Sequence, residues 1–317
     1  MKCKKILTAL LAAACTMSGC HGDLDIMQDN KLSASNMWID ESDAETATYG
    51  IYLYMRDALK SVHDIYLCWG EFRNGLWGAG TNKTLSGVDQ TQVRTSTMSS
   101  SNAYADWSVM YKTVNQANLI LKHVPEMGIS ESVRNFSLGN AYFSRAWCYF
   151  WIARIWGDAP LALTGYESTA GDLYLPRAPK AEIFARIESD LTEAERYVTD
   201  NSDKAVATPA AVQMLKADYA LWMYRVAGGG SSYLTMAEKA IEALNLSASR
   251  LESDYAQVFS SANKLNKEVI FAVHQANGEA VNGPGYYLGW NSNYVEAAYQ
   301  NNPVPLSLIH ISEPTRP

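Results

Sequence analysis

The chain has 317 residues, of which 48% are hydrophobic and 19% are charged, enough to bury one large core or two small ones. Its formal net charge is −7 and no basic stripe stands out, which excludes nucleic acid as an expected partner. The 9 tryptophans and 19 tyrosines outnumber the 7 phenylalanines. This bias suits a surface that stacks on polar ligands, although many of these rings are expected to fill seams between helices.

The first 19 residues predict a secretory signal. Three lysines precede a short apolar run over residues 6–14, too short to span a bilayer. The run ends in Met17-Ser18-Gly19-Cys20, which resembles the bacterial lipobox. We therefore expect removal of residues 1–19, lipidation at Cys20 and a polar tether over 20–41. A soluble secreted protein cut nearby is the alternative.

Only two cysteines remain after the signal and the lipidated position, Cys68 and Cys148. Cys148 lies among aromatic residues and is expected to be a small buried hydrophobe. A disulfide between the two suits an oxidising compartment, but the sequence leaves the pairing open.

Helical spacing of apolar residues predicts six helices within a mostly α-helical domain over residues 42–305. The first is expected to begin at Ser42, with Glu45 completing a capping box. Thr208 is a predicted N-cap, followed by Pro209 at the first helical position. The expected ranges are 42–62, 107–124, 131–156, 180–198, 209–226 and 234–246. Paired helices with short turns indicate a helical-repeat scaffold, and residues 268–273, EVIFAV, predict a buried strand.

Two segments rich in Gly, Asn and aromatic residues interrupt this pattern, at 63–100 and 282–294. Long irregular segments of a compact domain are usually functional or disordered, and these carry rings beside polar groups. We expect them to form the two walls of a ligand site. The candidate residues are Trp69, Arg73, Asn74, Trp77 and Asn82 on one wall, and Tyr286, Tyr287, Trp290 and Asn291 on the other. The alternative is that Trp69 and Trp77 fold inward as anchors of the loop.

No GxSxG, HExxH, paired-cysteine or phosphate-loop motif occurs. We therefore expect no catalytic residue, no cofactor and no metal ligand set. Loop carboxylates such as Glu71, Asp89 and Glu279 could pair as glycosidase acids only in three dimensions. There is no EF-hand-like loop, and bound calcium is left open.

Five segments of the chain form an ordered set: the lipobox with its leader, Trp107…Tyr111…Asn118, AYFSRAWCYFWIARIWGDAPL at 141–161, residues 175–194, and Thr208-Pro209-Ala210-Ala211 followed by Tyr255…Phe259 and EVIFAV. In this order they resemble the SusD/RagB family of outer-membrane nutrient-binding lipoproteins of Bacteroidetes. The most specific segment is 141–161, which is similar to the family's RA-x-x-Y-F helix and YGD-x-PL turn, with Trp156 in place of the usual Tyr.

The resemblance implies a fold of tetratricopeptide-like helix pairs with long irregular loops and a few short strands. It also implies a lipid-anchored protein on the surface of the outer membrane that binds an oligosaccharide and delivers it to a SusC-like TonB-dependent transporter. A RagB-like peptide-binding member is one alternative, and a scaffold that binds only protein partners is another. The identity of the glycan is left open.

The last residues, LSLIHISEPTR from 306 to 316, fit a translated library adapter, followed by Pro317. We interpret residues 306–317 as a sequencing artefact. Because members of the family are longer, we also expect residues 42–305 to be a domain that is incomplete at its C-terminus.

Overall fold

The computed structural model describes residues 37–70, 73, 88–168, 173–247 and 250–275. Within these residues the fold is built almost entirely from helices of a compact unit that begins at Trp38. The long helices are α2 (Glu41–Gly70), α4 (Ser108–His123), α5 (Glu131–Trp156), α6 (Lys180–Tyr197), α7 (Pro209–Arg225) and α8 (Ser232–Ala243). The short ones are α3 (Val88–Thr95), α9 (Tyr255–Val258) and the 3₁₀ turns at Ala103–Ala105, Val124–Glu126 and Ser261–Asn263.

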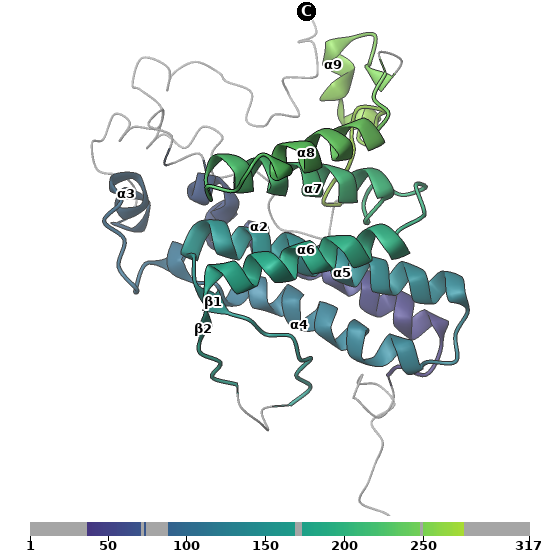
Figure 1. The fold of residues 1–317 in the computed structure, drawn as a ribbon, viewed down its shortest axis with the longest axis horizontal. Coiled ribbons are helices and arrows are strands. Elements are labelled where there is room, and N and C mark those ends of the chain that lie inside the picture. The colour runs from purple at the N-terminus through teal and green to yellow at the C-terminus, as the bar shows by residue number, and fades with distance from the viewer. Residues whose placement is uncertain (1–36, 71–72, 74–87, 169–172, 248–249, 276–317) are drawn as a thin grey trace, which may run out of the picture. The chain divides into compact units, whose positions relative to one another are not determined.

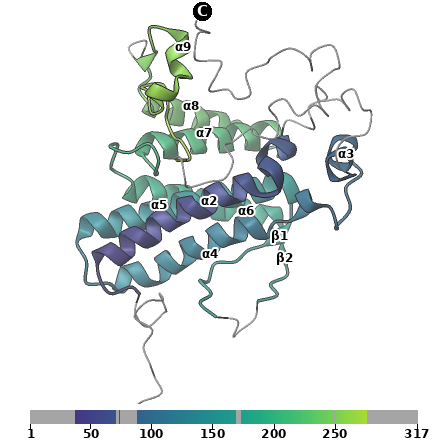
Figure 2. The same cartoon turned by 180° about the vertical axis from the view of Figure 1, so that it is seen from behind.

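Consecutive helices pack as neighbours, which confirms the predicted mostly α-helical fold of helix pairs. Helix α5 packs against α6, α4 and α2, and α7 packs against α8. Figure 1 and Figure 2 show α2 and α4 side by side on one flank, α5 and α6 in the middle, and α7 and α8 beyond them. The helix pairs thus form successive layers around one main core.

Helix α5 lies at the centre of that core because apolar residues occur on every side of the helix. Phe143, Cys148, Tyr149, Phe150 and Ile152 are all at most 2% exposed. They pack with residues of α4, α6 and α7 in a single cluster. A helix that is apolar on every side has to be buried on every side, and this is the position that α5 takes.

Local cap chemistry explains where two helices begin. The Thr208 side chain accepts a hydrogen bond from the Ala211 N–H at 3.1 Å, and Pro209 is the first residue of α7, as predicted. The prediction that Ser42 and Glu45 form the capping box of the first helix is wrong. Asp40 and Asp43 form it instead: the Asp43 N–H donates to Asp40 Oδ1 at 3.1 Å, and the Asp40 N–H donates to Asp43 Oδ2 at 3.2 Å.

The first helix also continues eight residues beyond its predicted end. Residues 63–70, expected to begin an irregular loop, form the last two turns of α2. Ile65 and Cys68 are buried there against Tyr104 and Val93. Helical spacing of apolar residues therefore persists to Cys68, and packing against α3 and the 103–105 turn extends the helix.

The strand predicted at 268–273 does not form. The only strands among the described residues are β1 (Ala159–Pro160) and β2 (Arg177–Ala178), antiparallel, with Ala159 opposite Ala178 and Pro160 opposite Arg177. Residues 268–273 are half-buried, and Phe271 packs on the main core. An apolar run of this length becomes a strand only when another strand pairs with it.

No disulfide joins the two cysteines that the sequence left open. Both are buried, Cys148 in the main core and Cys68 in the small cluster with Ile65 and Tyr104. Burial raises the pKa of the Cys148 thiol, which keeps it protonated. In addition, no helix within the described part of the chain is long and apolar enough to cross a membrane.

Candidate functional site

The loop that follows β1 is held against α4 by the side chains of two asparagines. Asn115 brackets the Tyr166 backbone: its amide group donates to the Tyr166 carbonyl at 3.0 Å, and its oxygen accepts from the Tyr166 N–H at 2.7 Å. Asn118 donates to the Ala162 carbonyl at 2.9 Å. The loop approaches so closely that a Cβ added to Gly165 would lie 2.8 Å from the Leu119 backbone nitrogen. Helix α4 therefore fixes the path of this loop.

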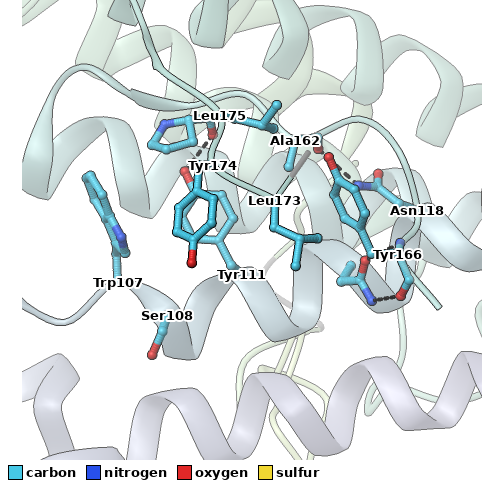
Figure 3. Close-up of a pocket in the computed structure, with 11 residues that line it drawn as sticks. Trp107, Ser108, Tyr111, Asn118, Ala162, Tyr166, Leu173, Tyr174 and Leu175 are labelled. Atoms are coloured by element: carbon cyan, nitrogen blue, oxygen red, sulfur yellow. Dashed lines mark hydrogen bonds between the residues drawn. The ribbon is translucent and has the colours of Figure 1, made fainter. Parts of the chain in front are cut away.

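A pocket of about 430 Å³ lies between this loop, the residues before β2 and the first turns of α4. Figure 3 shows Trp107 at one end, Tyr166 at the other, and Tyr111, Leu173 and Tyr174 between them. Four of its 11 lining residues are aromatic, and one of them, Tyr174, is 92% exposed. We call it the Trp107 pocket.

Two rings of the Trp107 pocket are held rigidly. The Tyr111 hydroxyl donates to the Pro160 carbonyl at 2.5 Å, and burial raises the pKa of that hydroxyl, so it stays protonated and donating. The Arg177 guanidinium lies 4.6 Å from the centre of the Trp107 ring. A cation over the ring and a hydrogen bond to the backbone fix both side chains before any ligand binds.

A second pocket, of about 500 Å³, lies on the other side of residues 104–108. We call it the Trp69 pocket. Its aromatic wall is Trp69, Trp151 and Trp156, and Arg73 and Arg154 also line it. The Trp69 indole N–H donates to the Tyr104 carbonyl at 2.9 Å.

The two pockets are joined by a chain of ring contacts. Trp156 lies edge-on to Trp69, with centroids 5.2 Å apart, and edge-on to Trp107, at 6.2 Å. The Trp156 indole N–H donates to the Ala105 carbonyl at 3.1 Å, in the segment that separates the pockets. A row of edge-on ring contacts therefore links the Trp69 pocket to the Trp107 pocket.

Two of the candidate residues chosen from the sequence lie in the described structure. Trp69 is half-buried on the last turn of α2, so it is both an anchor of that turn and a wall of a pocket. Arg73 is exposed at the same pocket. The other candidates lie outside the described residues: Asn74, Trp77, Asn82, Tyr286, Tyr287, Trp290, Asn291 and the lipidation position Cys20.

The prediction missed the Trp107 pocket. Helical spacing places Trp107 and Tyr111 in a predicted helix and does not indicate a pocket. Their partners Tyr166 and Tyr174 lie more than 50 residues further along the chain. The available signal was the run of Gly, Tyr and Leu at 163–175, between the end of one helix and the start of the next.

Arg145 and Asp158, two residues of the family-like segment at 141–161, have structural roles. Arg145 is paired with Asp190 in the core, and the Asp158 carboxylate accepts from the Lys180 N–H at 2.8 Å, at the start of α6. Among the residues the structure describes, no cluster of three or more His, Cys, Asp or Glu could hold a metal ion.

Layers of paired helices, with aromatic pockets at their loops, define a helical-repeat protein with two candidate ligand pockets. A family model described as "Starch-binding associating with outer membrane" matches residues 79–222. The chain is 26% identical over 190 residues to the SusD-like protein P38 of Formosa agariphila, an alignment that covers 60% of this chain and 36% of that one.

Solved structures agree with the family. The B. fragilis protein NanU superposes with a TM-score of 0.69 at 28% identity, over 82% of this chain and 53% of that chain. Surface glycan-binding protein A from Bacteroides thetaiotaomicron, solved with laminarihexaose, shares the fold with a TM-score of 0.63 at 17% identity, over 77% of this chain and 51% of that chain. The chain is a SusD-like protein. It spans about a third of the curated relative and about half of these solved structures.

Proposed function

We propose that this protein binds an oligosaccharide at the cell surface and delivers it to a TonB-dependent transporter of the outer membrane without cleaving it. The observation that carries the proposal is the aromatic lining of the Trp69 and Trp107 pockets, which the ring contacts of Trp156 link. Sugars present apolar C–H faces that stack on flat rings and hydroxyls that bind polar side chains. Volumes of about 430 and 500 Å³ suit ligands of a few sugar rings.

The glycan is proposed to run along both pockets, across Trp156. Arg73 and Arg154 line the Trp69 pocket and Tyr174 lines the Trp107 pocket, and we propose that these side chains contact the hydroxyl groups of the glycan. The candidates outside the described residues, Asn74, Trp77, Asn82, Tyr286, Tyr287, Trp290 and Asn291, are proposed to add further contacts. The name of the matching family model and the laminarihexaose complex of a protein with the same fold support a glycan ligand.

The cellular placement completes the proposal. The matching family is associated with the outer membrane. We propose that the chain is held there through lipid on Cys20, because acyl chains contribute about 0.8 kcal/mol for each methylene they bury in the bilayer. We propose the transporter as a partner because the five sequence segments together resemble the SusD/RagB family.

Replacing Tyr174 with alanine is expected to weaken glycan binding about 2- to 10-fold, because one stacking ring contributes about 0.5–1.5 kcal/mol. The ring is 92% exposed, so the melting temperature should not change. Calorimetric titration of a panel of neutral oligosaccharides against the wild type and Tyr174→Ala measures the effect. Tyr255→Ala is the matched control: its ring is 77% exposed, and it lines neither pocket.

Equal affinity of the wild type and Tyr174→Ala for a glycan that binds would exclude the Trp107 pocket. Trp77→Ala and Trp290→Ala test the two loop walls in the same titration. Peptide binding in place of glycan binding, or capture of a transporter without any sugar affinity, would contradict the proposed ligand.

A further inference from the structure

A third pocket, of about 420 Å³, lies where α7 begins. It shares no lining residue with the Trp69 or Trp107 pocket. Its polar lining includes Lys204, Arg250, Asn201 and Gln213, and its apolar wall is formed by Leu244, Val269 and Ile270. We call it the Lys204 pocket.

Two cations line this pocket, and neither has a carboxylate partner within hydrogen-bond reach among the described residues. The Lys204 ammonium donates to the Asn266 carbonyl at 2.6 Å, and the Arg250 guanidinium donates to the Leu244 carbonyl at 3.2 Å. Across the described part of the chain, neither side chain forms an ion pair. Backbone carbonyls are neutral, so among the described residues only the longer-range attraction of Glu252 offsets the charge of Lys204 beside the cavity.

The electrostatics of Lys204 agree with this geometry. Burial lowers the pKa of the ammonium and the nearby positive charge of Arg250 lowers it further, while Glu252 acts in the opposite direction. Glu195, which contacts Gln213, is already engaged: it accepts from Gln213 and from Lys216, both at 2.6 Å. An anion placed between Lys204 and Arg250 would relieve their mutual repulsion.

The start of α7 adds a third positive element. Thr208, Pro209 and Ala210 line the pocket, and α7 has 17 residues. The amino end of such a helix carries a partial positive charge, which favours anions near its first turn. Two cations and a helix end therefore face one cavity that has an apolar wall on its other side.

We propose that the Lys204 pocket binds an oxyanion, a carboxylate, sulfate or phosphate group, carried by a small ligand whose neutral part rests on Leu244, Val269 and Ile270. The aromatic pockets described above require no charge in their ligand, so this site is additional to the proposed glycan surface. Such a group can belong to an organic acid, including an acidic sugar, or to a free inorganic ion.

The test is calorimetric titration of the full chain with sodium sulfate, sodium phosphate and sodium glucuronate at constant ionic strength, with neutral glucose for comparison. At least one anion should bind saturably to the wild type. Lys204→Gln combined with Arg250→Gln should weaken that binding about tenfold or more, because both charge-assisted contacts are lost. The matched control is Lys239→Gln, which removes an exposed lysine of α8 outside this lining and should bind as the wild type does.

Asn201→Asp covers the case in which the double variant fails to fold. It leaves both cations in place and adds a carboxylate at the pocket, so it should weaken anion binding and raise the melting temperature. Tighter binding of glucuronate than of sulfate and phosphate would support an organic acid as the ligand, and the reverse order would support a free ion. If no anion binds saturably, or if all variants bind as the wild type does, the proposal is wrong. Tyr174→Ala should leave anion binding unchanged, which separates this test from that of the glycan surface.

Discussion

Replacing Asp190 with alanine is expected to lower the free energy of unfolding by about 3–5 kcal/mol. The Asp190 carboxylate is fully buried and receives both arms of Arg145: Nε donates to Oδ2 at 2.8 Å, and Nη2 donates to Oδ1 at 2.7 Å. Without Asp190, the guanidinium of Arg145 remains charged in the core, where among the described residues the Asn118 side-chain oxygen, at 2.7 Å from Nη1, is its other hydrogen-bond acceptor. A buried charge that loses its partner is far more costly than an exposed one.

Chemical denaturation of the wild type and Asp190→Ala measures this loss. Asp218→Ala is the control, because Asp218 faces Arg154 at 3.4 Å and its side chain is 52% exposed. Exposed ion pairs contribute about 0–1 kcal/mol, so this variant should unfold nearly as the wild type does. A similar small loss in both variants would mean that the buried pair does not hold the core together.

The same pair connects the core to the proposed glycan surface. Asn118 accepts from Arg145 and donates to the Ala162 carbonyl, at the start of the loop that lines the Trp107 pocket. We therefore expect Asp190→Asn, which keeps the shape of the side chain but removes its charge, to weaken glycan binding as well as stability. Asn118 is thus a positioning residue, since it acts through the loop.

Replacing Gly139 with alanine is expected to destabilise the protein by about 1–3 kcal/mol, although alanine is the better helix former. Gly139 lies within α5, where an added Cβ would be 2.7 Å from Val198 Cγ2 and 3.0 Å from the Val198 backbone nitrogen. Val198 is held by its own N–H, which donates to the Ala194 carbonyl at 2.9 Å at the end of α6. The methyl group therefore forces α5 and α6 apart.

Gly50 provides the matched control because it also lies inside a long helix, α2. The nearest atom to an added Cβ there is the Gln116 side-chain nitrogen at 3.6 Å, an ordinary contact. Gly50→Ala should stabilise the protein by about 0.5–1 kcal/mol, because the unfolded chain loses freedom and nothing clashes. Thermal unfolding of the two variants should therefore shift in opposite directions. Stabilisation by Gly139→Ala would show that the α5–α6 seam has room.

Local chemistry made several helix boundaries predictable. Thr208 and Pro209 start α7, and Gly157, with a φ of +72°, ends α5 as its C-cap. These signals operate within a few residues of the chain, so no tertiary partner is needed to recognise them. The apolar residues on every side of α5 likewise indicate a buried helix, and α5 is central in the core.

Predictions that depended on a distant partner failed. Residues 268–273 have the composition of a strand, but no described strand pairs with them. Residues 63–70 were expected to leave the helix, yet packing of Ile65 and Cys68 against Tyr104 accompanies two further turns of α2. In both cases the deciding contact lies far away in sequence, or is absent.

By itself, the sequence determined the helical class, most helix positions and the family. Only the tertiary structure decided which rings meet. Ring contacts join Trp156 to Trp69 and to Trp107, which are far apart in the sequence. Asn115 and Asn118 hold the loop that carries Tyr166, and Tyr166 and Tyr174 line the same pocket as Trp107 and Tyr111. The reason is physical: helical periodicity records which face of each helix is apolar, whereas a pocket depends on how those faces pack together.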